Sequence, residues 1–224
     1  MIIFDPAEHT PTKRQGMLAQ VIAPRPIAMI STANSDGVTN VAPYSYFMAI
    51  TGEPMLVGVT MGALREADGL PKHTYENATR TGEFVINVTS DPMGQHIETA
   101  AMEFPGDVSE VDHIGWTAIP SQVVSAPSIA ESPVHMECRI HQVVDLGDPK
   151  VLHSGVHLVI AEVVCLVMDE SVCTPDYRVD QAALRPVGRM GFPWFNRATP
   201  ESMFQLPRVP YRDFVAASAG ATEA

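Results

Sequence analysis

Short apolar runs that alternate with polar residues, separated by clusters of turn-forming residues, recur along this chain. The first clear run, Pro26–Thr32, carries no charge, and its alternation predicts a strand with both faces largely buried. Four turn formers, Asn34–Gly37, then predict a reversal, and Val38–Ala42 returns as the partner strand. Pro43 has no backbone N–H, so we expect it to end regular pairing. The pattern therefore predicts a β-hairpin.

Three aromatic rings and a serine follow this hairpin, in the segment Tyr44–Phe47. Rings just past a strand end predict a platform for a flat ligand with polar edges. Alternation along an extended chain places Tyr44 and Tyr46 on one side. If the strand continues past the proline, Ser45 and Phe47 are expected to share a different environment. The alternative reading is that the rings plug the core and that the serine hydroxyl bonds its own backbone.

The remainder of the chain predicts more strands and a few short helices. Gly82 is expected to close one helix as a left-handed cap, and Pro92 fits the first position of a second helix. Strands are expected over Met55–Thr60, Glu83–Thr89, Val134–Val144 and Gly155–Met168. Helices are expected over Lys72–Thr81, from Ser90 or Asp91 to about Met102, over Asp180–Arg185, and at most briefly near Glu110.

The run Val134–Val144 has the clearest strand alternation in the chain. Its predicted core face carries Val134, Met136, Cys138 and Ile140. Its other face, expected to be solvated or to meet a partner, carries His135, Glu137, Arg139 and His141.

Consecutive strands with few helices indicate a mainly β fold, an antiparallel barrel or sandwich rather than a wound parallel sheet. A chain of 224 residues with 46% hydrophobic content suits one domain. We expect residues 1–24 to form an N-terminal arm, residues 25–206 the domain and residues 207–224 a tail that is disordered after Phe214.

Composition narrows the classes of partner. The formal net charge of −12 would repel nucleic acid and anionic membrane surfaces. The longest apolar run, Leu158–Met168, contains Glu162 and is shorter than the roughly 20 residues of a membrane-spanning helix. Three cysteines without metal-type spacing, and an amino terminus lacking a basic segment followed by an apolar one, favour a cytoplasmic location.

The start of the helix at Lys72, His73 and Thr74 is a candidate anion site. The free backbone donors and positive dipole end of a helix start favour an anion, and a glycine-rich loop leads into it. The chain has only three lysines, and one lies here. The alternative is an ordinary helix start with a solvated lysine.

Several kinds of catalytic machinery lack their residues in this sequence. It contains no phosphate-binding loop of the nucleotide-hydrolase type, no Rossmann glycine fingerprint and no glycine-flanked nucleophilic serine. His153 and His157 are four residues apart, which spans ~13 Å in a strand, and no suitably placed third ligand accompanies them. We therefore expect no metal site.

The aromatic loop, the helix start and the loop at Arg189 together suit a bound cofactor. A flavin mononucleotide (FMN) needs donors for its pyrimidine edge, an apolar wall for its rings, and cations with a helix start for its phosphate. Hydride transfer from NADH or NADPH needs chiefly a nicotinamide stacked on the flavin, so the cofactor carries the chemistry. This explains the lack of an evident acid or base.

Five stretches, in this order, carry a resemblance to a known family: RPIAMISTANSDGVTNVAPYSYF, KHTYENATRTGEFVINV, ESPVHMECRI, HLVIAEV and ALRPVGRMG. Together they resemble the flavin reductase-like proteins with an FMN-binding split barrel, over about Gln20–Leu206. The resemblance implies an antiparallel Greek-key split β-barrel with a few short peripheral helices. It also implies a homodimer with FMN near the dimer interface.

By motif position, the resemblance implies three groups of cofactor contacts. Lys72 and Thr74 would contact the phosphate, and Thr60 would contribute with the glycine-rich loop. Family members commonly have an aspartate where this chain has His73, which makes the local field less acidic. Ring and ribityl contacts are implied for Asn40, Ala42, Ser45, Tyr46 and Phe47.

His157 and Trp194 are the catalytic candidates. His157 and Arg189 match positions that often face the flavin or its substrate in the family. A histidine in an apolar strand could instead be a satisfied core residue. Trp194 could cover the outer face of the flavin or seal the dimer. Arg189 lies between two glycines, where packing offers it little, so we expect a ligand or interface role.

The leading hypothesis is an FMN-dependent NAD(P)H oxidoreductase that passes electrons to free flavin, oxygen or a small organic acceptor. One version supplies reduced flavin to a separate monooxygenase component. Another acts directly on a bound substrate such as a nitroaromatic acid. A third hypothesis, from a different class, is a non-enzymatic flavin- or haem-binding module.

Overall fold

The computed structural model describes residues 1–62, 64–147 and 155–212. The tail predicted to be disordered after Phe214, together with His153, lies outside these residues. The helices are α1 Pro11–Val21, α2 His73–Thr81, α3 Ile97–Ala100, α4 Glu110–Ile114 and α5 Gln181–Leu184, with 3-10 helices at Pro6–Glu8, Asp91–His96 and Pro200–Ser202. The strands are β1 Arg25–Pro26, β2 Ala28–Ala33, β3 Thr39–Tyr44, β4 Phe47–Gly52, β5 Met55–Met61, β6 Glu83–Val88, β7 Ala118–Ile119, β8 Ser128–Ile129, β9 Val134–Asp145, β10 His157–Met168, β11 Val187–Arg189 and β12 Phe195–Arg197.

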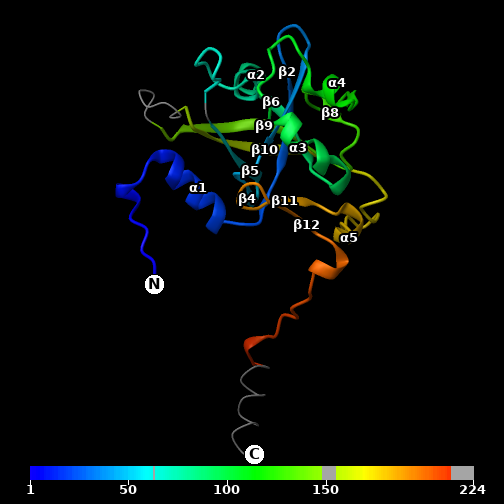
Figure 1. The fold of residues 1–224 in the computed structure, drawn as a ribbon. Coiled ribbons are helices and arrows are strands. Elements are labelled where there is room, and N and C mark those ends of the chain that lie inside the picture. Colours follow the sequence, from blue (N-terminus) through cyan, green and yellow to red (C-terminus); the bar gives the residue numbers. More distant parts are fainter. Residues whose placement is uncertain (63, 148–154, 213–224) are drawn as a thin grey trace, which may run out of the picture.

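One antiparallel sheet of seven strands dominates the fold, in the order β3-β2-β6-β9-β10-β5-β4 (Figure 1). A three-stranded sheet, β1-β11-β12, and a two-stranded sheet, β7-β8, lie beside it. The helices are short and peripheral. The predicted mainly β, antiparallel architecture is therefore confirmed.

The predicted hairpin forms from β2 and β3, with Ser31 opposite Val41. Asn34 holds the turn, because its side-chain oxygen accepts hydrogen bonds from the backbone N–H groups of Asp36 and Val38, both at 2.9 Å. The expectation that Pro43 ends the pairing was wrong, since β3 continues through it to Tyr44. Within the described chain β3 is an edge strand, where a residue without a backbone donor is tolerated.

The segment after β3 is shorter than the predicted aromatic loop. Only Ser45 and Tyr46 connect β3 to β4, because β4 begins at Phe47 and pairs with β5 from Phe47 opposite Val59. The sequence did not predict β4. A turn at Glu53 and Pro54 joins β4 to β5, and the strand predicted over Met55–Thr60 is confirmed as β5.

Helix α2 forms as predicted and ends at Gly82, which has a φ of 74° and donates its N–H to Ala78 O at 2.8 Å. The second predicted helix is less regular. It begins as a 3-10 turn in which Met93 N–H bonds Ser90 O, and only Ile97–Ala100 is α-helical. The short helix near Glu110 is confirmed as α4.

The described residues form four buried apolar clusters, of which two are large. The main one packs the sheet against α2, and the second lies under α3 and α4. The main cluster contains Ala28, Ile30, Val57, Val59, Met61, Ala78, Phe84, Ile86, Cys138, Val159, Ala161 and Val163. The second contains Ile27, Met29, Val41, Met93, Ile97, Ala100, Val111, Trp116, Ile129 and Val187.

Strand β9 corrects one expectation. Arg139 and His141 are exposed as predicted, but His135 and Glu137 on the same face are buried. Strand β8 and the segment before it cover this part of the face and supply polar partners. His135 Nε2 lies 2.9 Å from the carbonyl oxygen of Ile129, so the ring is satisfied in its buried position.

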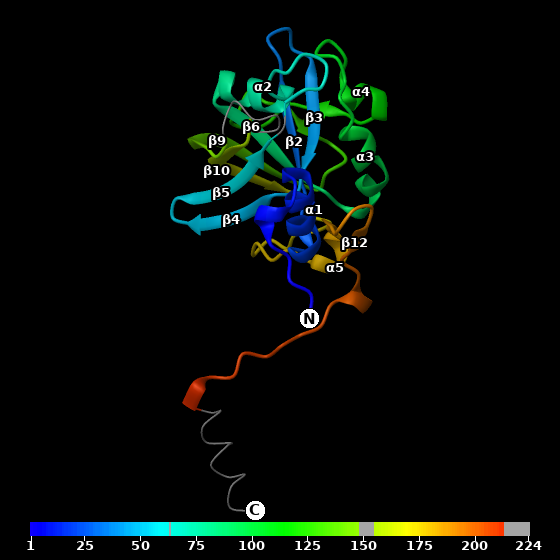
Figure 2. The same ribbon diagram turned by 60° about the vertical axis from the view of Figure 1, so that its left-hand side comes forward.

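The N-terminal arm is partly helical. Thr10 caps α1 through a hydrogen bond from Lys13 N–H to its hydroxyl oxygen. None of the α1 residues, all of which the structure describes, is buried. Figure 2 shows α1 lying in front of the sheet, on the side of β4 and β5. The helices of the described chain include none that is long and apolar enough to cross a membrane.

Candidate functional site

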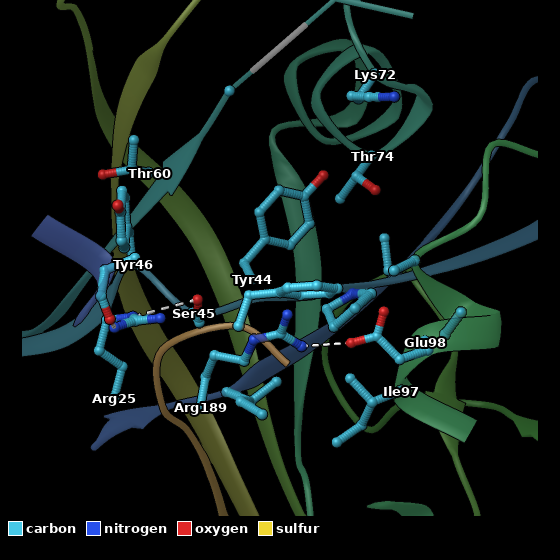
Figure 3. Close-up of a pocket in the computed structure, with 18 of the residues that line it drawn as sticks. Arg25, Tyr44, Ser45, Tyr46, Thr60, Lys72, Thr74, Ile97, Glu98 and Arg189 are labelled. Carbon is cyan, nitrogen blue, oxygen red and sulfur yellow. Dashed lines mark hydrogen bonds and ion pairs between the residues drawn. The ribbon is translucent and has the colours of Figure 1, made fainter. Parts of the chain in front are cut away.

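A cavity of about 900 Å³ lies where the end of β3, the start of α2, α3 and the β11 region meet (Figure 3). Helix α1 closes one side of it. This volume is in the range of small-molecule and cofactor sites. The lining residues from the sheets and their connections are Arg25, Ile27, Asn40, Ala42, Pro43, Tyr44, Ser45, Tyr46, Thr60, Gly62, Arg65, Val156, Arg189, Met190, Phe192 and Phe195. Those from the helices and adjoining segments are Pro11, Thr12, Gln15, Gly16, Leu18, Ala19, Lys72, His73, Thr74, Ile97, Glu98, Ala100, Ala101, Met102, Glu103, Phe104 and Glu110.

The predicted cofactor residues come together in this cavity, with one exception. The described residues that line it do not include Phe47, whose ring packs against the main apolar cluster instead. The expectation that Ser45 shares the environment of Phe47 was also wrong, because Ser45 lines the cavity with Tyr44 and Tyr46. The predicted residues found there are Asn40, Ala42, Ser45, Tyr46, Thr60, Lys72, His73, Thr74 and Arg189.

The structure does not bring the two catalytic candidates into the cavity lining formed by the described residues. His157 stacks on Tyr75, with ring centroids 4.0 Å apart, and its Nδ1 lies 2.5 Å from Asp145 Oδ1. Trp194 is 72% exposed in the loop between β11 and β12. A catalytic role for either residue stays a prediction.

Lys72 does not stand alone at the start of α2. Its Nζ lies 2.5 Å from Glu103 Oε2. Glu103 also accepts hydrogen bonds from Glu66 N–H at 3.1 Å and Ala67 N–H at 3.2 Å. Hydrogen bonding from Lys72 lowers the pKa of the Glu103 carboxyl, so the pair is ionic. An anion that binds at this helix start would displace the Glu103 carboxylate from Lys72.

A row of hydrogen bonds joins three residues of the cavity wall, Thr74, Asn40 and Glu110. Thr74 Oγ1 donates to Asn40 Oδ1 at 2.8 Å, and Asn40 Nδ2 donates to Glu110 Oε1 at 2.8 Å. Glu110 Oε2 accepts from Val41 N–H at 3.1 Å. Burial raises the pKa of Glu110, and burial likewise raises the pKa of Tyr44 to about 12.

Arg189 approaches the cavity between two phenylalanine rings. Its guanidinium carbon lies 4.3 Å from the ring centroid of Phe195 and 5.7 Å from that of Phe192. Figure 3 shows its guanidinium pointing at Glu98 of α3, with which it forms an ion pair. Aromatic faces beside a guanidinium are typical of a site for a planar anion.

Arg25 joins three parts of the wall. Its guanidinium donates to the carbonyl oxygens of Ala19 and Ile22 at the end of α1, and to Met190 O at 3.2 Å. Its Nε lies 3.5 Å from Ser45 Oγ. Arg25 is 6% exposed. A cation at carbonyl groups that lack helical partners stabilises a helix end, so Arg25 fixes α1 over the cavity.

We expect Arg25→Ala to release α1 from the cavity, because the helix has no buried side chain to hold it. Loss of hydrogen bonds to a charged group should raise the fraction of molecules in which α1 has left the cavity at least about tenfold. Trypsin cleavage after Lys13 or Arg14 under native conditions measures this population. Arg178→Ala, at an exposed arginine paired with Asp176, is the control. Equal cleavage rates in both variants would contradict the role of Arg25.

Two further titratable side chains, Arg65 and His73, lie at the start of α2. Arg65, which is buried, pairs with Asp68 and with Glu76 of α2. His73 is desolvated, and burial, followed by the charge of Arg65, lowers the pKa of its ring. The described residues include no group of three or more histidine, cysteine and acidic side chains that could hold a metal ion.

Sequence reasoning missed Arg25, Glu98, Glu103 and Glu110 as parts of the site. An arginine directly before an uncharged strand was a usable signal for Arg25. The acidic residues lie in segments with no periodic pattern, and their positions depend on how α3 and α4 fold back over β3. No local signal in the sequence identifies them.

Comparison with known proteins gives consistent matches. A family model described as "Flavin reductase like domain" matches residues 21–179. An uncharacterized protein of Halalkalibacterium halodurans is 36% identical over 174 residues, which are 78% of this chain and 81% of the relative. Nitrilotriacetate monooxygenase component B from Bacillus cereus has a similar structure, with a TM-score of 0.83 and 29% identity, covering 92% of this chain and 98% of that one.

A more distant structure supports the fold alone. It is described as a flavin reductase with a split barrel domain, from Shewanella frigidimarina. It has a TM-score of 0.75 and 21% identity, covering 94% of this chain and all of that one. The predicted split-barrel architecture is therefore confirmed.

Proposed function

This chain belongs to the flavin reductase-like family, and we propose that it is an FMN-dependent oxidoreductase that takes hydride from NADH or NADPH. Electrons then leave to free flavin or to a small organic acceptor. The observation that carries this proposal is the meeting of two distant segments in one cavity. The aromatic turn at Tyr44–Tyr46 and the helix start at Lys72–Thr74 both line it.

The two segments fit the two ends of FMN. Tyr44 and Tyr46 offer rings beside the apolar Ala42 and Ile97, which suits an isoalloxazine wall. Lys72 and the backbone N–H groups at the start of α2 suit a phosphate. No nucleophile is required of the protein, because a bound flavin itself supplies the hydride chemistry.

The chain's own residues bind, orient and exclude water in this proposal. Helix α1, fixed by Arg25, shields the cavity from solvent on one side. Thr60 on β5 reaches the cavity beside Tyr46, whose carbonyl oxygen accepts the Thr60 backbone N–H at 2.8 Å. The strands on this side would hold and orient the flavin ring, which would supply the hydride-accepting chemistry.

A second copy of the chain is part of the proposal. The sheet face that carries Thr60 also carries the exposed apolar side chains of Met48 and Ile50 on β4, which lie beside Gly58 of β5. Continuity between this face and the cavity supports a homodimer with the cofactor near the interface. A partner monooxygenase is supported by the similarity to a protein named as a monooxygenase component B.

Visible absorbance of the purified protein, before and after addition of FMN, tests the proposal. We expect the two bands of oxidised flavin and their bleaching by NADH or NADPH. A haem Soret band, or colourless protein that fails to bind added FMN, would contradict it. Bound flavin that NADH and NADPH do not bleach would instead support the non-enzymatic binding module.

A direct reductase of an aromatic acid is the second candidate. The position of Arg189 beside Phe195 favours it, because this pair suits the ring and carboxylate of such a substrate. Steady-state assays separate the two versions. NAD(P)H oxidation that needs added free flavin and ignores nitroaromatic acids would exclude the direct reductase.

We expect Glu98→Gln to lower the KM for a nitrobenzoate about two- to fivefold if Arg189 binds the substrate carboxylate. The variant removes the carboxylate that pairs with Arg189, and a largely exposed ion pair has a small net energy. Nitrobenzene, which has no carboxylate, is the control substrate and should show an unchanged KM. A nitrobenzoate KM that does not fall would remove Arg189 from the substrate site.

A further inference from the structure

We infer that Glu110 orients Asn40 so that the hydroxyl group of Thr74 accepts a hydrogen bond from the uncharged part of a bound flavin, instead of donating one to its phosphate. This inference rests on the proposed function, because it names the part of the same ligand that Thr74 meets. It changes the role expected for Thr74 and gives a role to Glu110.

Glu110 on α4 carries a buried carboxyl group, with the residue only 3% exposed. Its two oxygens meet two donors, Asn40 Nδ2 at 2.8 Å and Val41 N–H at 3.1 Å. A backbone N–H can only donate, so Glu110 Oε2 accepts from Val41, and Glu110 Oε1 is the acceptor that faces Asn40. The group that Asn40 turns toward Glu110 is therefore its NH₂.

The orientation of Asn40 then fixes its other end. With the NH₂ facing Glu110, Oδ1 faces two hydroxyl groups, Thr74 Oγ1 at 2.8 Å and Thr32 Oγ1 at 3.4 Å. Thr32 Oγ1 accepts from Asn77 Nδ2 at 3.2 Å, so its own proton is available for Asn40. An amide oxygen can only accept, and both threonines donate to it.

Thr74 is left with acceptor capacity alone toward the cavity. A hydroxyl group has one proton, and that of Thr74 is directed at Asn40. The Tyr44 hydroxyl group, which Figure 3 shows pointing toward Thr74, also hydrogen-bonds this side chain, so one lone pair of Thr74 Oγ1 remains for a ligand. Thr74 is 1% exposed, so its side chain cannot turn freely to a new partner.

An acceptor at this position suits one part of FMN and not another. The ribityl chain carries hydroxyl donors and the ring carries an N–H donor, whereas an ionised phosphate offers only acceptors. The phosphate is then bound by Lys72 and by backbone N–H groups of α2, including that of Thr74. The side chain and the backbone of Thr74 meet different parts of the ligand.

Riboflavin, which lacks the phosphate, separates these roles. We expect Thr74→Val to weaken the binding of FMN and riboflavin equally, by about five- to tenfold. Lys72→Ala should weaken FMN and leave riboflavin within roughly twofold of wild type. Thr74→Ser should keep both affinities. A Thr74→Val protein that loses FMN affinity but keeps riboflavin affinity would overturn the inference.

A double-variant cycle tests the part played by Glu110. Glu110→Gln places an amide NH₂ against one of the two donors that Glu110 accepts from, Asn40 Nδ2 or Val41 N–H. Asn40→Asp places its carboxylate in contact with that of Glu110. Each single change should weaken flavin binding about tenfold. Together they restore complementarity: the new amide accepts from Val41 N–H and donates to the new carboxylate, which still accepts from Thr74. The double variant should return to within roughly threefold of wild type.

Additive losses in this cycle would refute the orienting role of Glu110. Thermal unfolding of the flavin-free variants gives a second reading, in which the double variant should again recover most of the Tm lost by each single one. If the wild-type protein binds neither FMN nor riboflavin, the proposed function fails. The unfolding cycle then still tests whether Thr74 donates to Asn40 and Asn40 donates to Glu110.

Discussion

Lys72→Ala is expected to weaken FMN binding by about 1.5 to 3 kcal/mol, roughly 10- to 150-fold, the range for a charge-assisted hydrogen bond. The variant removes a cation from the start of α2 and also leaves Glu103 without it. The Glu103 carboxylate would then face the phosphate as a like charge. The effect should therefore lie toward the upper part of this range.

Fluorescence titration with FMN at several salt concentrations measures this effect. The difference between wild type and variant should shrink as salt screens the phosphate contact. Lys13→Ala, at an exposed lysine of α1, is the matched control and should bind FMN as wild type does. Unchanged FMN affinity in Lys72→Ala would remove Lys72 from the phosphate site.

Glu137→Ala is expected to lower the free energy of unfolding by about 3 to 4 kcal/mol. Glu137 is 0% exposed and its carboxylate accepts three backbone N–H groups: Gln122 at 2.6 Å, Val123 at 2.7 Å and Val124 at 3.3 Å. Alanine leaves these donors without their acceptor and opens a space under the segment that crosses β9. For a chain of this size the Tm should fall by roughly 10 °C.

Two variants make this measurement specific. Glu170→Ala, at an exposed glutamate just after β10, should change the free energy of unfolding by less than about 0.5 kcal/mol. Glu137→Gln keeps the shape and one acceptor oxygen, so its effect should lie between those of the two alanine variants. A Glu137→Ala protein as stable as Glu170→Ala would show that water replaces the carboxylate at no cost.

Periodicity predicted the strands well where burial follows the sheet itself. The strands β2, β5, β6, β9 and β10 alternate or run apolar because neighbouring strands and α2 cover them. Glu137 breaks the rule for a physical reason. Its face is covered by a loop whose backbone donors need an acceptor, and a glutamate fills that need while looking like a solvated residue in the sequence.

Proline and turn signals in the sequence marked where strands meet turns, but they did not predict how the strands pair there. Pro43 predicts the end of a ladder in any strand with two neighbours, but β3 has one neighbour among the described strands. The sequence did not predict β4 because its first residue, Phe47, continues the aromatic segment that begins at Tyr44. Its apolar residues Met48 and Ile50 are exposed. The pairing through Pro43 and the formation of β4 both depend on the order of strands in the sheet, which a local sequence pattern does not encode.

The sequence predicted several residues that line the cavity, but not the carboxylates that pair with some of them. Motif positions placed Asn40, Thr60, Lys72 and Arg189 at one cavity, and the structure brings them together. Their carboxylate partners come from α3, its following segment and α4. Those segments are short and aperiodic, so only the folded chain shows that the site's cations are already paired.

The bond from Val41 N–H to Glu110 also concerns the outer edge of the sheet. An edge strand with unpaired backbone donors can accept a strand from another molecule, which leads to aggregation. On β3 the donor of Val41 is occupied by a side chain, and Pro43 has no donor to offer. The edge beside the cavity therefore offers few backbone donors to an added strand and is protected against strand addition.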